Sequence, residues 1–144
     1  MTDAALCAAA RHGDKRAIAR LVSAFEDPRP QAAPRRAAIL AALADRPIGR
    51  VVGLTGGALL GDRTRVRFAG DDPRLYFRSQ ASGAIAGGVA RATHQVCRLL
   101  TRLFATVIVE TVGVGQGEIE IVRIADTTWL VVQPHGGDAI QFLK

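Results

Sequence analysis

The chain has 144 residues, 49% of them hydrophobic, and this length suits one domain with a buried core. No apolar run approaches the roughly 20 residues of a membrane-spanning helix, and the N-terminus lacks the basic and then apolar order of a signal peptide, so we expect a cytoplasmic protein. The formal net charge of +6 does not by itself indicate nucleic-acid binding, because the arginines are scattered and only five Phe, one Tyr and one Trp could stack on bases.

Helical patterns fill the first third of the chain. Thr2 or Asp3 is suited to cap a helix that extends to about Arg11, and Asp14 is suited to cap a second helix after an HGD turn. The apolar residues of the second helix recur at helical spacing on one face: Ile18, Leu21, Val22 and Phe25. This pattern predicts an amphipathic helix that packs on another element.

Prolines shape the segment that follows. Asp27-Pro28 ends the second helix, and the prolines up to Pro34 prevent a regular helix there. Pro34 itself suits the first turn of a third helix, roughly from Arg35 to Ala44. We therefore predict a helical N-terminal arm over residues 1–46.

After residue 47 the pattern changes to that of β structure. Val51 to Leu54 is a predicted strand that leaves through Thr55-Gly56-Gly57. Leu75 to Phe77 is a plausible second strand, and Thr127 to Val132 is the predicted final strand. Residues 47–144 are thus expected to form the α/β part of the protein.

A further helix is expected from Val89 onward, and a short terminal helix near Asp138. The apolar residues of the first of these follow helical spacing: Val89, Val96, Cys97, Leu100, Leu103 and Phe104. This helix leads into another strand, as the helix of a βαβ crossover does. The predicted fold class is α/β, a helical leader followed by a mostly parallel sheet of about four strands.

The most informative stretch runs from Thr106 to Glu118. Its apolar part ends in a carboxylate at Glu110, and a continuous β-branched run is typical of a strand buried in a parallel sheet. Ligands bind beyond the carboxyl ends of such strands, so Glu110 is expected where a ligand or metal would be met. The glycines that follow are Gly113, Gly115 and Gly117. These glycines would let the backbone approach a phosphate closely. The alternative interpretation of the stretch is a buried strand followed by a flexible loop without a ligand.

Other catalytic signals are weak. Cys7 and Cys97 are too few and too far apart in sequence for a zinc cluster, and two lone thiols fit a reducing compartment. The histidines are best interpreted as turn or surface residues, and no GxSxG nucleophile motif occurs. We assign no catalytic residue.

Seven sequence blocks, in this order, resemble the methylmalonyl-CoA mutase-associated GTPases, also called the ArgK or MeaB type of P-loop GTPase. The blocks are VVGLTG (51–56), GALLGDRTRV (57–66), FRS (77–79), GGVARAT (87–93), VIVETVGVGQ (107–116), ADT (125–127) and GDAIQ (137–141). An ordered series of this kind is much more specific than one glycine loop.

The resemblance implies a Mg²⁺-dependent GTP-binding protein that serves as a chaperone for cobalamin loading of methylmalonyl-CoA mutase. Asp62 and Glu110 match the family's acidic magnesium positions, and carboxylate oxygens suit that ion. The implied nucleotide and switch positions are Gly53, Gly56, Thr111, Gly113, Val114, Gly115, Gln116, Gly137 and Asp138. Loops of this kind are ordered by the γ-phosphate and relax on hydrolysis.

The sequence also departs from the family pattern. The family's phosphate loop has the form GxxxxGK[ST], but here Gly56 is followed at once by GALLGD, so the lysine, the hydroxyl and the helix that they open are absent. The chain also ends at Lys144, before the family's guanine-reading NKxD segment. Gly83-Ala84 stands where the family usually has Arg-Gly.

We therefore expect a degenerate family member whose GTP binding and hydrolysis are lost or strongly impaired. The alternative is a non-catalytic binding or regulatory module that uses the switch surface to contact the mutase or a full-length relative, as part of a homo- or hetero-oligomer. A third interpretation is the remnant of an internally deleted gene.

Overall fold

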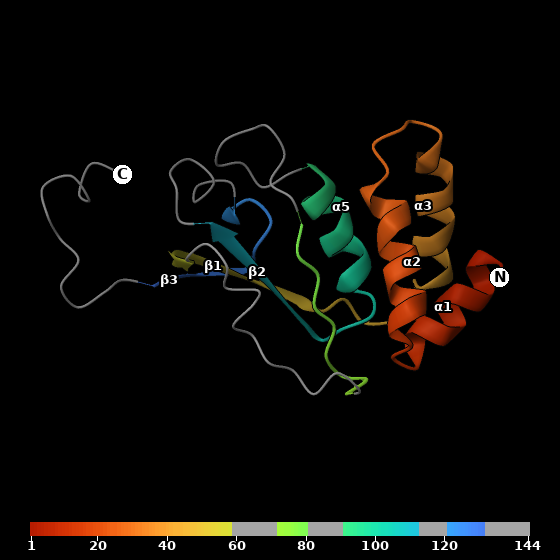
Figure 1. Ribbon diagram of the computed structural model, residues 1–144, viewed down its shortest axis with the longest axis horizontal. Helices are drawn as coiled ribbons and strands as arrows, with labels where there is room; N and C mark the ends of the chain where they lie inside the picture. The colour runs from red at the N-terminus through yellow and green to blue at the C-terminus, as the bar shows by residue number, and fades with distance from the viewer. Residues whose placement is uncertain (59–71, 81–90, 113–120, 132–144) are drawn as a thin grey trace, which may run out of the picture. The chain divides into compact units, whose positions relative to one another are not determined.

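The computed structural model describes residues 1–58, 72–80, 91–112 and 121–131 (Figure 1). These residues form elements in the order α1, α2, α3, β1, α5, β2, β3. The chain divides into two compact units, which we call the helical unit (1–50, 67–80 and 91–107) and the sheet unit (51–66, 81–90 and 108–144). No helix of the described residues has the length and hydrophobicity that crossing a membrane requires.

Two capped helices open the helical unit, as the sequence predicts. Helix α1 spans Asp3–Arg11, and the Thr2 hydroxyl accepts a hydrogen bond from a first-turn amide at 3.3 Å. Helix α2 spans Lys15–Glu26, and the Asp14 carboxylate accepts two first-turn amides at 2.8 and 3.0 Å. Gly13, between the helices, has φ 80°, a conformation that glycine adopts without steric cost. Both predicted N-caps are confirmed.

The third and fourth described helices differ slightly from their predicted bounds. Helix α3 spans Ala32–Ala42 and so begins three residues before the predicted start. Pro34 lies in its first turn, where the missing amide hydrogen has no helical partner to lose. Helix α5 spans Arg91–Leu100, and residues 101–103 form a turn after it. Residues 81–90, and with them the predicted start at Val89, lie outside the described part of the chain.

The core of the helical unit lies where α2 packs on α1, α3 and α5, four helices that Figure 1 shows gathered together. Phe25, Ile18 and Leu21 of α2 are at most 1% exposed. The buried cluster consists of Leu6, Cys7, Ala10, Ala17, Ile18, Leu21, Val22, Ala24, Phe25, Ile39, Leu43, Val96 and Leu99. The apolar face of α2 therefore faces helices on several sides, which explains its strongly amphipathic sequence.

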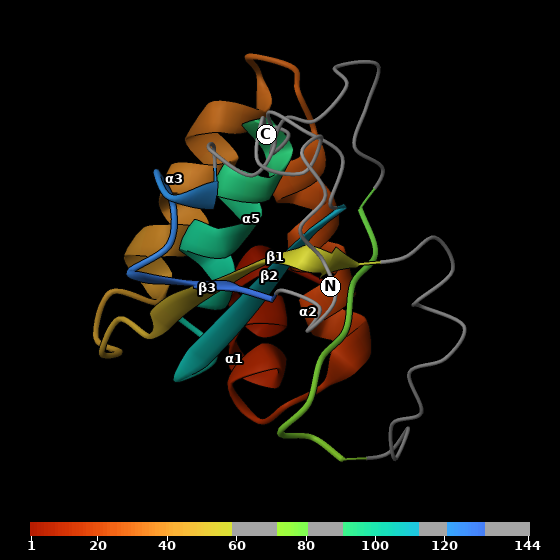
Figure 2. The same ribbon diagram turned by 90° about the vertical axis from the view of Figure 1, so that its left-hand side faces the viewer.

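Three strands form the described sheet, in the order β2-β1-β3 (Figure 2). They are β1 (Arg50–Ala58), β2 (Thr106–Val112) and β3 (Thr127–Leu130). Strands β1 and β3 are parallel, with Val52 opposite Thr127, and the arrows of all three strands run in one direction. The predicted α/β class with a mostly parallel sheet is confirmed.

Three strand predictions need correction. Residues 75–77 form no strand, because the extended segment around them packs on helices instead of pairing with the sheet. β1 does not leave the sheet at Thr55, since the Thr55 carbonyl accepts the amide of Val131 at 2.8 Å and the strand continues to Ala58. β2 lies at an edge of the described sheet, and Ile108 on it is 63% exposed, so this strand is not buried on both faces. The helix predicted near Asp138 lies outside the described residues.

Candidate nucleotide site

A pair of threonine hydroxyls joins β1 and β2 near their carboxyl ends. The Thr111 hydroxyl lies 3.1 Å from Thr55 Oγ1 and 3.3 Å from the Leu54 carbonyl oxygen, both within hydrogen-bonding distance. Thr55 and Thr111 are only 5% and 8% exposed. Thr111 is a predicted switch residue, whereas Thr55 was missed. Only knowledge of the strand order could have paired them, because 56 positions separate the two residues.

Glu110, the predicted magnesium ligand, precedes Thr111 on β2 and has an exposed side chain. Alternation along a strand places the two side chains on opposite faces of the sheet. Within the described ranges, no three His, Cys, Asp or Glu side chains come together as a metal site would require. Asp62, the second predicted ligand, lies outside these ranges. Of the two predicted magnesium ligands, only Glu110 lies among the described residues. One exposed carboxylate does not by itself fit a magnesium site.

Gly53, a predicted nucleotide-binding residue, lies in the middle of β1 and is buried. A Cβ atom at this position would lie 2.6 Å from Cγ1 of Ile121 and 3.3 Å from the Cβ atom of Ala125. Ile121 is fully buried against this strand. Close packing in the sheet unit thus explains the glycine, and its role toward a nucleotide stays a prediction.

Asp126 secures the opposite end of the sheet. Its Oδ2 accepts the amide of Val51 at 2.7 Å, and its own amide donates to the carbonyl of Val51 at 2.9 Å. The two hydrogen bonds fix the turn before β3 to the start of β1. Asp126 belongs to the ADT block of the sequence, and the structure gives it a role in fixing strand register.

The remaining predicted positions divide by location. Gly56 is part of β1, with extended backbone. The others lie outside the described residues: Asp62, Gly113, Val114, Gly115, Gln116, Gly137 and Asp138. The structure thus brings together Gly53, Gly56, Glu110 and Thr111 on two adjacent strands, and the roles of all these residues stay predictions.

The two cysteines are buried and form no disulfide. Burial raises the pKa of the Cys97 thiol to about 11, so little thiolate is present near neutral pH. This agrees with the interpretation of the cysteines as small apolar residues.

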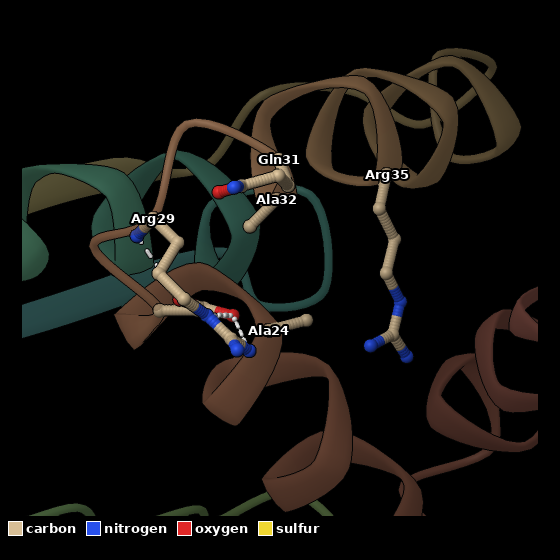
Figure 3. A pocket seen from close by; sticks show the side chains of 6 residues that line it. Ala24, Arg29, Gln31, Ala32 and Arg35 are labelled. Atoms are coloured by element: carbon tan, nitrogen blue, oxygen red, sulfur yellow. Dashed lines mark hydrogen bonds and ion pairs between the residues drawn. The ribbon is translucent and has the colours of Figure 1, made fainter.

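A hollow of about 370 Å³ lies in the helical unit, where α2 turns into α3 (Figure 3). The guanidinium groups of Arg29 and Arg35 extend into the same open space. Each is already paired with a carboxylate, Arg29 with Asp27 at 2.7 Å and Arg35 with Asp3 at 2.8 Å. Hydrogen bonds from Arg29 lower the pKa of Asp27 to about 2, so this carboxyl is ionised at neutral pH. The hollow offers no unpaired arginine for an anion.

Comparison with known proteins connects these features to one family. The sequence profile described as "Methylmalonyl Co-A mutase-associated GTPase MeaB" matches residues 18–144. A putative GTPase of Pyrococcus abyssi is 48% identical over 91 residues, which make up 62% of this chain and 28% of the relative. A mitochondrial methylmalonic aciduria type A homolog of Caenorhabditis elegans is 37% identical over 92 residues, 63% of this chain and 23% of the relative. The chain thus spans less than a third of the length of these relatives.

A solved structure shares the fold. The protein described as LAO/AO transport system kinase superimposes with a TM-score of 0.63, over 90% of this chain and 49% of its own length. The sequences are 24% identical in this comparison, so the likeness concerns the fold alone. It supports the order of a helical leader followed by an α/β sheet.

Proposed function

This chain belongs to the MeaB family of methylmalonyl-CoA mutase-associated GTPases, and we propose that it is a degenerate member in which GTP binding and hydrolysis are lost or strongly impaired. We propose, from the sequence pattern, that it is a cytoplasmic protein and, from the family resemblance, that its partner is methylmalonyl-CoA mutase or a related mutase. GTP and Mg²⁺ are the ligands that this resemblance implies, and we propose that neither is held tightly.

The observation that carries the proposal is the backbone of β1 at Gly56. In a phosphate loop the first glycine ends the strand, and the following amides turn together toward the phosphate oxygens. Here β1 continues through Gly56 to Ala58. Successive amides of a strand point to opposite edges of the sheet, so they do not converge on one anion.

The charge that a phosphate loop supplies is missing too. The chain has two lysines, Lys15 and Lys144, and neither follows a glycine as the GK pair of the motif requires. Phosphoryl transfer depends almost wholly on positioning and on electrostatic stabilisation. Removal of a single donor from a preorganised site lowers kcat roughly 100-fold to 1,000-fold, so loss of the whole cradle removes most of the rate enhancement.

The test is GTP hydrolysis by the full chain with Mg²⁺, measured as phosphate release under single-turnover conditions. We expect a rate indistinguishable from buffer, and a family member with an intact GxxxxGK[ST] loop serves as the positive control. Hydrolysis well above the buffer rate that is lost in Glu110→Ala, but kept in a matched variant of the helical unit such as Asp45→Ala, would contradict the proposal.

The helical unit favours a second function, a non-catalytic binding or regulatory module. Its core is continuous across four helices, so this unit has the packing of a stable scaffold even though the phosphate loop is missing. The partners we propose are the mutase and a full-length relative of this chain. The test is capture of each by the immobilised chain, with and without GTP, with the destabilised core variant Phe25→Ala as a control for dependence on the folded helical unit. Failure to retain either partner in every condition would contradict this function.

A further inference from the structure

Residues 72–80, drawn in light green in Figure 1, form an extended segment of the helical unit, which we call the strap. In sequence, the strap carries the FRS block and joins the segments that contain the GALLGDRTRV and GGVARAT blocks. Residues 72–80 are not assigned to any strand of the described sheet, and the contacts below hold the segment in place.

Two packing contacts fix the first half of the strap. Pro73 lies against the α1–α2 turn, so closely that a Cβ atom on Gly13 would come within 2.7 Å of its Cβ atom and of its carbonyl oxygen. Tyr76 packs against the helical core and stacks on Phe104, with ring centroids 6.4 Å apart and an interplanar angle of 23°. The aromatic contact stabilises the strap beyond simple burial.

A hydrogen-bond network fixes the second half, and Glu26 at the end of α2 is its centre. The Arg78 guanidinium donates to both carboxylate oxygens of Glu26, from Nε at 3.0 Å and from a terminal nitrogen at 2.6 Å. The amide of Gln80 donates to the same carboxylate at 3.2 Å, and the Thr93 hydroxyl of α5 donates to Gln80 Oε1 at 2.6 Å. One carboxylate thus connects α2, the strap and α5.

The environment of Glu26 favours its charged form. Burial raises the pKa of this carboxyl, but the hydrogen bonds from Arg78 and Gln80 outweigh burial and hold the pKa below its usual value. The Glu26 side chain is 24% exposed and that of Arg78 is 41% exposed. A two-point contact of guanidinium with carboxylate is stronger and more directional than a single hydrogen bond.

We propose that Glu26 is the positioning residue that holds the strap on the helices, and that Arg78 is a structural clamp and not an anion-binding group. Glu26 occupies Nε and one terminal nitrogen of Arg78 and neutralises its positive charge, so the remaining N–H groups make a weaker anion site than a free arginine would. All of these contacts lie within the helical unit.

Trypsin provides a direct test, because the strap contains two cleavage sites, Arg74 and Arg78. Initial cleavage rates at each bond of the full chain are measured from fragment masses. We expect slow cleavage after Arg78 in the native chain, and a rate about tenfold higher in Glu26→Gln, which keeps the side-chain volume but loses the charge. Glu26→Asp keeps the carboxylate, and we expect it to return the rate to within about threefold of the native chain.

Two further variants separate the clamp from general unfolding. Gln80→Ala removes one hydrogen bond and leaves the ion pair, so cleavage after Arg78 should rise about two- to threefold. The matched control is Asp72→Asn, which weakens the ion pair between Asp72 and Arg74 and should change cleavage after Arg78 by less than about twofold. Equal cleavage after Arg78 in the native chain and in Glu26→Gln would overturn the proposal.

Anions test the second half of the proposal. Millimolar inorganic phosphate, or GTP with Mg²⁺, should leave cleavage after Arg78 unchanged in the native chain. If either anion slows cleavage after Arg78 but does not slow cleavage after Arg74 in the same sample, Arg78 binds anions. This result would overturn the proposal that Arg78 is a structural clamp.

Discussion

The helical unit and the sheet unit differ in how well they bury apolar side chains. Seven of the eight largest fully buried side chains among the described residues belong to the helical unit: Phe25, Ile18, Leu21, Ile39, Leu43, Leu99 and Val22. The eighth is Ile121 of the sheet unit. The described sheet residues include exposed large hydrophobic side chains, namely Ile108, Val122, Trp129, Leu130 and Val131. Among the described residues the buried core therefore lies with the helices, whereas most of the nucleotide motifs belong in sequence to the sheet unit.

The largest expected effect is on the helical core. Phe25→Ala should lower the free energy of unfolding by about 3–5 kcal/mol, because the ring is 1% exposed and its removal leaves a cavity among packed helices. Urea denaturation followed by far-ultraviolet circular dichroism measures this change. A loss below about 1 kcal/mol would show that the helical unit does not carry the stability of the chain.

A change at Gly53, a tightly packed position of β1, should have the next largest effect. Gly53→Val should lower the free energy of unfolding by about 1–3 kcal/mol. The Cβ atom of the new valine would lie only 2.6 Å from Cγ1 of Ile121, so the isoleucine must move. Trp129 is the only tryptophan and lies on β3, so its fluorescence reports on the sheet unit. We expect the fluorescence transition to shift more than the helical dichroism, and Gly53→Ala to shift it less than Gly53→Val. Coincident shifts of both signals would contradict the contrast between the units.

The ion pair between Glu26 and Arg78 should make a smaller, pH-dependent contribution to the free energy of unfolding. Because the folded pKa of Glu26 is lowered, its stabilisation is present above the unfolded pKa near 4.5 and is lost as the pH falls through the folded value. Glu26→Gln should therefore cost about 1 kcal/mol at neutral pH, an amount reduced by the partial exposure of the pair, and almost nothing in strong acid. Thermal unfolding of both proteins across this pH range measures the difference. A cost that is independent of pH would contradict the charged clamp.

The smallest effect is expected on the exposed edge of the sheet. Leu130→Ser should change the free energy of unfolding by less than about 0.5 kcal/mol, because Leu130 is 64% exposed. Chemical denaturation followed by Trp129 fluorescence measures it. A loss of about 2 kcal/mol or more would mean that this side chain is buried in solution, and that the sheet unit has a larger core than the described residues show.

Local features of this fold could be predicted from the sequence. The caps at Thr2 and Asp14 and the apolar face of α2 depend on residues a few positions apart, so short-range chemistry determines them. The parallel sheet followed from the family resemblance and from the strand pattern. The strand pattern also places Glu110 correctly on β2, whereas Thr111, predicted only as a switch residue, proves to lie on the same strand.

Features that depend on distant pairing could not be predicted. The edge position of β2 and the hydroxyl pair of Thr55 and Thr111 follow from the strand order, which no local pattern encodes. Residues 75–77 have the composition of a strand, but the stacking of Tyr76 on Phe104 holds them on helices instead. The length of β1 was underestimated, because glycines usually end a strand unless a neighbouring strand continues to pair with it.

The most direct test of the lost nucleotide site is isothermal titration of the full chain with GTP in the presence of Mg²⁺. We expect no saturable heat up to about 1 mM GTP, which corresponds to a binding free energy weaker than about −4 kcal/mol. Binding with a micromolar Kd that is lost in Glu110→Ala, and kept in Asp45→Ala, would show instead that these strands hold a nucleotide without a phosphate loop.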